Sequence, residues 1–428
     1  MVMISCNFVR KHLTFRNGCV TINGFERKDI MSIKSSYKHT IWAAYVGYIT
    51  QAIINNFVPL LLLTFQTTWD IPLYQLTLLV SINFGVQLTV DLICAQVIDK
   101  IGYRPCIVTA HLLAAIGLAG LGIFPFVLPD PYIGILVSII IYAIGGGITE
   151  VLISPIVEAC PTEHKESSME LLHSFYCWGH VFVILASTAF FALVGVNHWR
   201  ILAFGWALIP MLNALYFSIV PIKQLNESVD TEEIPLGNLA RKPIFWLFIV
   251  LMLCAGASEQ AMSQWASAFA EAGLDVSKTI GDLAGPCLFA ALMGLSRLIS
   301  SRLALKFEQS KLMVGCCGLC IVSYLLAALS PYPALALVGC ALCGLSVGIM
   351  WPGTFSLAAT VCRGGGTALF ALLALAGDFG CMSGPAVVGL VADATGGEMA
   401  YGLLLAIIFP VLLGGGLILC RKAPKNSK

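Results

Sequence analysis

Twelve apolar stretches, each about as long as a bilayer is thick, follow one another through the 428 residues of the sequence. A helix needs roughly 20 apolar residues to cross roughly 30 Å of hydrocarbon. Helices are expected rather than a barrel, because lipid offers no partner for free backbone groups and barrel strands are short and alternate in polarity. We therefore predict an all-α membrane protein with twelve transmembrane helices. The predicted spans are residues 40–64, 72–98, 105–128, 132–157, 168–194, 200–220, 243–270, 280–304, 312–330, 334–360, 365–392 and 399–420.

The composition excludes a water-soluble enzyme. The chain is 58% hydrophobic and 11% charged, with a mean hydropathy of +0.88, whereas soluble domains are about 45–50% apolar and about 25% charged. A net charge of +1 without a basic stripe gives no reason to expect nucleic acid as a partner. Cysteines such as Cys94 and Cys381 lie inside apolar runs and are expected to pack as small hydrophobic residues. The pair Cys317 and Cys320 has no second pair to complete a metal site, so we expect neither a metal nor a cofactor.

Lys and Arg predict the orientation, because they concentrate on the cytoplasmic side of a membrane. With both termini in the cytoplasm, 22 of the 24 Lys and Arg lie on the inner side, and only Arg200 and Lys278 lie outside. We expect a multi-pass protein of the inner (plasma) membrane. Residues 1–37 contain neither a span nor a signal peptide and are expected to be a cytoplasmic tail. In the alternative interpretation, translation starts at Met31 and residues 1–30 are not part of the native protein. N-terminal sequencing of the native protein would test this.

The predicted spans fall into two groups of six, separated by a polar stretch. A glycine-rich stretch followed by a proline occurs in the fourth and the tenth span, at residues 145–155 and 344–352, as expected of an internal repeat. Two six-helix halves around a midplane cavity suit a carrier that works by alternating access. The predicted organisation is a tail at 1–37, bundles at 38–220 and 243–420, a cytoplasmic linker at 221–242 and a tail at 421–428.

The loop after the second span carries a recognisable motif. Its residues Asp99, Lys100, Gly102 and Arg104 resemble the signature GxxxDRxGRR of the major facilitator superfamily, with Ala95 in place of the first glycine. The resemblance implies the major facilitator fold of two six-helix bundles. The acid and the two cations can pair with the other half or with a helix end in one conformation and release in another, so we expect a gate. A solvated turn that only fixes the topology is the alternative.

Ionisable residues inside predicted spans are costly in lipid and are therefore candidates for function. The deepest are Glu150, Glu259, Arg297 and Asp378. Glu150 follows three glycines, which allow close helix packing, and a buried carboxyl that resists ionisation can gain and lose a proton. We expect proton coupling at Glu150, with Glu259 and Arg297 as partners in it. A structural ion pair between Glu150 and Arg297 is the alternative.

A polar face that ends in an aromatic ring on the seventh span is typical of a sugar site. Glu259, Gln260 and Gln264 offer carboxyl and amide groups to hydroxyls, and Trp265 can stack on the face of a pyranose. Such groups fit a neutral polyhydroxylated ligand better than a cationic drug, and plain contacts between helices are the alternative. The expected substrate-binding residues are Gln51, Asn55, Asn56, Glu150, Glu259, Gln260, Gln264, Trp265 and Asp378.

Four stretches are similar to the fucose permease-like branch of the superfamily, which includes fucose, galactose and glucose symporters that use protons. They are Glu150–Pro155, Gly256–Trp265, Arg297–Leu303 and Pro352–Leu357. The resemblance implies that Glu150 is central to sugar binding and proton coupling and that Arg297 is a functional cation of the cavity. Asn55 stands where symporters of this branch can have a carboxylate. The proton site is therefore retained elsewhere, as at Glu259 or Asp378, or it is absent, as in a uniporter.

We expect a monomeric secondary transporter, not an enzyme, that moves a small neutral solute, in the simplest case a monosaccharide, together with protons. The proton gradient supplies the energy in place of a cofactor, and Na⁺ is an alternative coupling ion. A proton-driven exporter of drugs or metabolites and a non-transporting membrane receptor are the competing functions. Efflux of lipophilic cations without sugar-induced alkalinisation would indicate the exporter, and ligand binding without flux would indicate the receptor.

Overall fold

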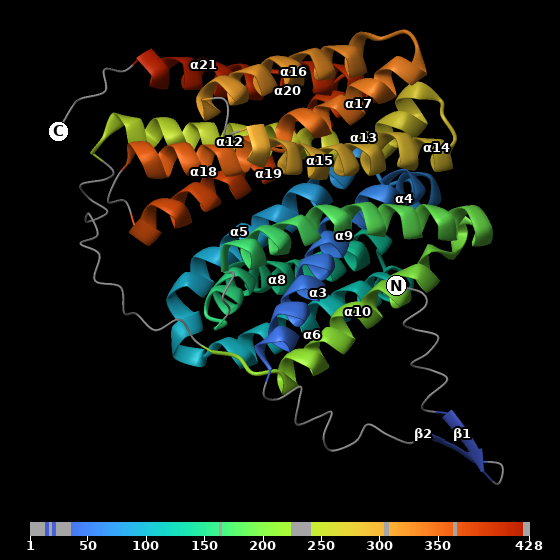
Figure 1. Cartoon of the computed structure of the whole chain (residues 1–428). Coiled ribbons are helices and arrows are strands. Elements are labelled where there is room, and N and C mark those ends of the chain that lie inside the picture. The colour runs from blue at the N-terminus through green and yellow to red at the C-terminus, as the bar shows by residue number, and fades with distance from the viewer. Residues whose placement is uncertain are drawn as a thin grey trace.

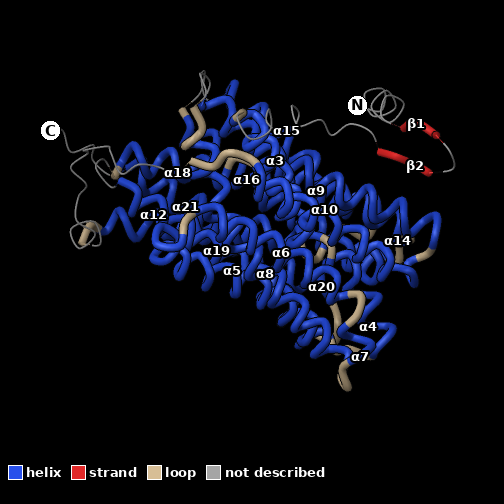
Figure 2. Tube along the Cα trace, turned by 90° about the horizontal axis from the view of Figure 1, so that it is seen from below, coloured by secondary structure: helices blue, strands red, loops and turns tan. Residues whose placement is uncertain are grey.

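The computed structural model describes residues 13–16, 19–22, 36–161, 165–223, 241–303, 308–362 and 366–422. Nearly all of the described chain is helical (Figure 1, Figure 2). Two short antiparallel strands near the N-terminus, β1 (Leu13–Arg16) and β2 (Cys19–Ile22), form a hairpin. The proposed start at Met31 and most of the predicted linker at 221–242 lie outside the described residues.

Twelve described helices are long and apolar enough to cross a membrane, which confirms the predicted fold class. Figure 1 shows the two halves as two layers, coloured blue to green and yellow to red. The first half consists of α3 (Tyr37–Asn56), η1 (Val58–Leu61), α4 (Leu62–Trp69), α5 (Leu73–Ile101), α6 (Tyr103–Leu121), α7 (Phe124–Val127), α8 (Pro131–Glu158), α9 (Lys165–Val194), η2 (Val196–His198) and α10 (Trp199–Ile219). The second half consists of α12 (Pro243–Ser263), α13 (Ala266–Ala268), η3 (Phe269–Gly273), α14 (Lys278–Asp282), η4 (Leu283–Cys287), α15 (Leu288–Leu303), α16 (Gln309–Leu329), α17 (Pro333–Val347), α18 (Met350–Val361), α19 (Gly366–Ala394), α20 (Met399–Ala406) and α21 (Ile408–Lys422).

Prolines and an aspartate mark where several helices begin. Pro131, Pro243 and Pro333 occupy the first turn of α8, α12 and α17, where the missing amide proton has no helical partner to lose. Asp130 caps α8, because its side chain accepts a hydrogen bond from the Tyr132 amide at 2.9 Å. These local signals place the helix starts at the ends of the bundle.

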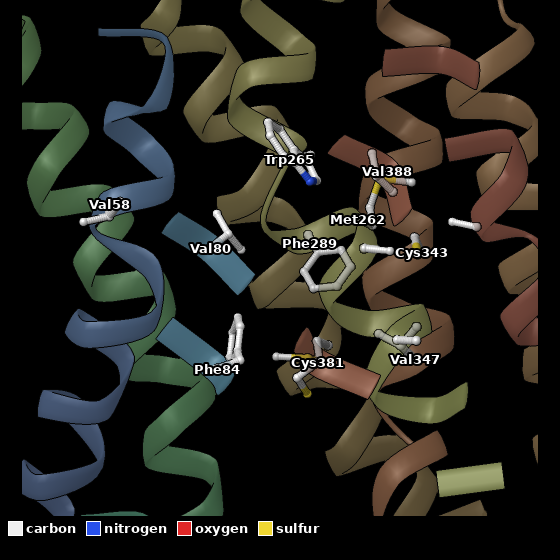
Figure 3. Packing of buried hydrophobic residues seen from close by; sticks show 14 of the residues in the cluster. Val58, Val80, Phe84, Met262, Trp265, Phe289, Cys343, Val347, Cys381 and Val388 are labelled. Atoms are coloured by element: carbon white, nitrogen blue, oxygen red, sulfur yellow. The ribbon is translucent and has the colours of Figure 1, made fainter. Parts of the chain in front are cut away.

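The two halves meet along two pairs of helices. α5 of the first half packs on α19 of the second, and α9 packs on α15. α5 and α15 are the second spans of their halves and α9 and α19 are the fifth, so the same contact occurs twice, as expected of a repeated fold. Figure 3 shows the apolar part of this boundary, with Val80 and Phe84 of α5 on one side and Trp265, Phe289 and Cys381 of the second half on the other.

Glycines bring α8 close enough to its neighbours to place Glu150 in the interior. A Cβ on Gly145 would overlap the carbonyl oxygen of Ala110 on α6, and a Cβ on Gly147 would lie 2.9 Å from the carbonyl oxygen of Gln87 on α5. Such close approach agrees with the packing expected of these glycines. Glu150 follows within one turn of the same helix.

Gly147→Val is expected to lower the free energy of unfolding by about 1–3 kcal/mol, because the new side chain must push α5 away from α8. Gly205→Val on α10 is the matched control, since a Cβ at Gly205 meets no atom within 4 Å. Thermal unfolding of the two purified variants measures the difference. Equal unfolding temperatures would show that α5 and α8 are not tightly packed at this point.

Candidate functional site

A cavity of about 150 Å³ lies between the two halves. A volume of this size is far above the roughly 10–15 Å³ that one water molecule requires, so the cavity has room for a small organic solute. The first half contributes Tyr48, Gln51, Asn55, Phe84, Gln87, Glu150 and Tyr176 to its lining. The second half contributes Glu259, Gln260, Arg297, Trp351, Asp378 and Cys381. The lining therefore combines charged, amide and aromatic groups from both halves.

A chain of amide hydrogen bonds positions Glu150 in the wall of the first half. Gln51 Nε2 donates to Gln87 Oε1 at 2.6 Å and to Glu150 Oε2 at 3.0 Å. Gln87 Nε2 donates to Asn55 Oδ1 at 2.9 Å, and the same oxygen accepts from Asn83 Nδ2 at 3.1 Å. Because these amides fix the carboxyl, a change in its protonation changes the hydrogen bonds that the cavity offers to a solute.

A row of polar groups on α12 forms the facing wall. Gln260 Nε2 donates to Glu259 Oε1 at 3.2 Å, and Gln264 Nε2 donates to Gln260 Oε1 at 2.9 Å. Gln264 Nε2 also lies 3.2 Å from the backbone carbonyl oxygen of Asn55, to which it donates across the boundary between the halves. The four-residue spacing from Gln260 to Gln264 places both on one helix face, as the sequence predicts.

Arg297 on α15 is a half-buried cation in the cavity wall. It faces Glu259 of its own half and Tyr48, Tyr176 and Cys177 of the other half. None of the ion pairs found among the described residues includes Arg297, so a direct pair with Glu150 is not present there. Among the described residues its Nε is buried and has no hydrogen-bond partner. The guanidinium as a whole carries five N–H donors and contributes the positive charge of the lining.

Two further carboxyl groups meet where α5 packs on α19. Asp91 and Asp378 lie close enough to each other and to Glu150 to interact electrostatically. Carboxyl groups that lie close together resist ionising at the same time, because like charges repel. These acids at the boundary between the halves are therefore further candidates for proton binding.

Six of the nine predicted substrate-binding residues line the cavity, and Asn56, Gln264 and Trp265 do not. Asn56 Nδ2 donates to the carbonyl oxygen of Ala52 at 2.9 Å, one layer behind the wall. Trp265 is 1% exposed, and its indole N–H donates to the carbonyl oxygen of Pro385 at 2.9 Å. The structure thus places the Trp265 ring in the core, where it cannot stack on a solute as we expected.

Trp351 on α18 contributes an aromatic ring to the cavity wall, as Tyr48, Phe84 and Tyr176 do. Its indole packs over Gly377 of α19, where any Cβ would collide with the ring. Phe355 supports it from the side at a distance of 6.2 Å between ring centroids. Because Gly377 precedes Asp378, the ring and the carboxyl lie on adjoining parts of the wall.

Sequence reasoning missed several residues of the lining. For α5 a signal was present, since Asn83, Gln87 and Asp91 follow one another at four-residue spacing and mark a polar helix face inside an apolar run. Isolated aromatic residues in apolar runs carry no such signal. The missed lining residues are Tyr48, Phe84, Gln87, Tyr176, Trp351 and Cys381.

Arg104, one of the predicted gate residues, is bound to a helix end of its own half. Its Nη1 donates to the carbonyl oxygens of Phe217 and Ser218 at 2.9 and 2.8 Å, in the last turn of α10. The helix dipole favours a cation there. Lys100 is exposed, and the side chain of Asp99 lies outside the described part of the chain. The gate stays a prediction.

A family model of the Major Facilitator Superfamily matches residues 41–385. The chain belongs to the Major Facilitator Superfamily. This major facilitator protein is therefore a multi-pass membrane protein whose fold supports secondary transport of small molecules. A search of curated proteins finds no match.

Two solved transporters share the fold over nearly their whole length. A bacterial homologue of the human lysosomal transporter Spinster, inward-facing and occupied, is 13% identical with a TM-score of 0.72, and the match covers 91% of this chain and 97% of that one. The E. coli fucose:proton symporter FucP is 18% identical with a TM-score of 0.62, and the match covers 90% and 99%. At such low identity the likeness shows the fold alone.

Proposed function

We propose that this major facilitator protein carries a monosaccharide across the inner (plasma) membrane in symport with protons. The observation that carries the proposal is the cavity between the halves, whose lining combines amide, carboxyl and aromatic groups. The similarity to fucose permease-like sequences supports a sugar, and so does the fold shared with a fucose:proton symporter. In this proposal a monomer works by alternating access, with both termini in the cytoplasm as Lys and Arg predict.

The chemistry of the lining suits a solute rich in hydroxyl groups. Amides such as Gln51 and Gln260 both donate and accept hydrogen bonds, as each hydroxyl of a sugar requires. Arg297 contributes a charged guanidinium to the lining, whose N–H groups can only donate. Trp351 offers a ring for the apolar face of a pyranose, the role that we expected of Trp265.

Glu150 is the proposed proton carrier. It takes up a proton from the outside, the sugar binds beside it, the halves rock, and the proton leaves toward the cytoplasm. A protonated carboxyl donates a hydrogen bond whereas a carboxylate only accepts, so sugar affinity and proton occupancy are linked through the bonds at Glu150. Glu259 and the pair Asp91 and Asp378 are further proton carriers in this scheme, and Na⁺ is the alternative coupling ion.

The number of carboxyl groups favours a second candidate, a proton-driven exporter of cationic drugs or metabolites. Glu150, Glu259 and Asp378 line the cavity together with a single cation, Arg297. A lining with more acids than bases attracts cations whenever those acids are ionised. A proton held by any of these closely spaced acids reduces this excess, which favours the neutral solute.

One monosaccharide of a panel is expected to raise the unfolding temperature of the purified protein by about 5 °C at roughly 100 times its dissociation constant, because it binds only the folded state. Gln260→Ala should remove most of the shift. Lys311→Met should keep it, since Lys311 pairs with Glu308 at 3.2 Å on the surface. Stabilisation by lipophilic cations alone would favour the exporter, and no stabilisation by any sugar would contradict the proposed substrate.

A further inference from the structure

A charge network joins the two halves at the end of the bundle that lies away from Ser36 and Lys422, hereafter the distal end. Lys278, the first residue of α14, has its Nζ 2.9 Å from Glu271 Oε1 and 3.2 Å from Asp282 Oδ2. The same Nζ donates to the carbonyl oxygen of Leu60 at 2.7 Å. Leu60 belongs to η1 in the first half, so this bond crosses the boundary. Figure 1 shows α4 and α14 at the end of the molecule opposite the C-terminus.

Asp282 makes a second connection between the halves. Its side chain is fully buried, and its carboxylate accepts from Ser267 Oγ of its own half at 2.5 Å. Thr188 Oγ1 on α9, in the other half, donates to Asp282 Oδ2 at 3.4 Å. The ring of Phe191, one turn further along α9, lies 5.5 Å from Lys278 Nζ. Two segments of the first half, the α3–α4 turn and α9, are thus bound to the same ion-paired cluster of Lys278 and Asp282.

Irregular helix flanks this network on both sides. η3, which contains Glu271, and η4, which begins directly after Asp282, are π-helical turns. Such turns are rare and occur frequently at functional sites. In the sequence, Lys278 stands out only as one of two basic residues at the distal end.

We propose that Lys278, Glu271 and Asp282 form a distal latch that holds the halves together in this state and opens when the carrier exposes its cavity at the distal end. The Lys278 ammonium group has three N–H donors, one for each of its acceptors: Glu271, Asp282 and the Leu60 carbonyl oxygen. When the halves separate, Lys278 keeps both carboxylates and loses its bond to Leu60 and the nearby Phe191 ring, and Asp282 loses the hydrogen bond from Thr188, so no buried charge is left without a charged partner. This moderate cost suits a contact that breaks in every cycle, whereas separating a buried ion pair would cost far more. The inference holds whichever solute the cavity takes.

Hydrogen exchange of the full-length protein in lipid nanodiscs tests the latch. In Lys278→Met, amides in peptides 57–63 and 185–195 should exchange about tenfold faster, the effect of one lost hydrogen bond to a charged group. Thr188→Val keeps every charge and nearly the same shape and removes a longer bond of 3.4 Å, so the same amides should exchange about twofold to threefold faster. Because opening one end closes the other, peptides 97–106 and 355–362 at the opposite end should exchange more slowly. A merely structural contact would not produce this second change.

Arg200→Met is the control at the same end, because Arg200 binds the Gly122 carbonyl oxygen and the Phe126 ring within its own half. In Arg200→Met, the exchange rates of the peptides at both ends should stay at the wild-type values. If Lys278→Met fails to fold, Thr188→Val decides the question alone. Unchanged exchange in Thr188→Val, or faster exchange at both ends, would overturn the latch.

Discussion

Glu150→Gln is expected to abolish proton-driven accumulation of sugar while the exchange of sugar across the membrane stays within about fivefold of wild type. The glutamine amide can still hydrogen-bond Gln51, which donates to Glu150 Oε2 at 3.0 Å in the native protein. It cannot bind or release a proton, so sugar movement is uncoupled from the gradient. Proteoliposomes with an imposed pH gradient measure accumulation, and counterflow with labelled sugar measures exchange.

Gln51→Ala separates the two roles that Glu150 can have. It removes the amide that holds the carboxyl but leaves the carboxyl able to take up a proton, so accumulation should persist at lower apparent affinity. If Glu150→Gln instead loses accumulation and exchange together, with normal folding, Glu150 binds the substrate without coupling. If Glu150→Gln still accumulates sugar, its role as proton carrier is wrong.

Arg297→Met is expected to lower the transport efficiency, kcat/KM, by about 100-fold or more. The substitution removes a charged donor from the lining and leaves Glu259, which faces it, without its nearby cation. The loss of a charge-assisted hydrogen bond together with such an unpaired acid corresponds to this magnitude. Initial rates of counterflow over a range of sugar concentrations measure it.

Arg297→Lys is the informative companion variant. It keeps the charge but not the planar fork of donors, so it should recover part of the lost activity. Lys311→Met removes a cation of the same half from the surface and should transport normally. Wild-type kinetics in Arg297→Met would show that the guanidinium does not take part in binding.

The membrane spans and the buried charges could be predicted from the sequence, because each depends on a one-dimensional property. An apolar run must cross the membrane wherever it folds, and an acid inside such a run has few structural uses. Glu150, Glu259 and Arg297 were found in this way, and all three line the cavity. The predicted first span, 40–64, is too short. In the structure it runs from Tyr37 to Trp69, because the chain continues as a helix after the 3₁₀ turn at Val58–Leu61.

The aromatic residue of the site could not be predicted, because its position depends on packing between distant segments. Trp265 directly follows the polar face of the seventh span in the sequence, but it lies beyond the end of α12 at Ser263, and its ring packs in the core. Trp351 reaches the cavity only because Gly377, on another helix, leaves room for its ring. Contacts of this kind leave no periodic pattern in the sequence.

Sugar-induced proton movement tests the central claim most directly. Purified protein in proteoliposomes, with a pH dye outside and no imposed gradient, receives the sugar that stabilises it most in the thermal panel. The wild type should alkalinise the external medium as sugar and protons enter together, and Glu150→Gln should take up sugar without any pH change. Sugar uptake by the wild type without proton movement, or proton-driven efflux of lipophilic cations with no sugar uptake, would contradict proton-coupled sugar transport through this cavity.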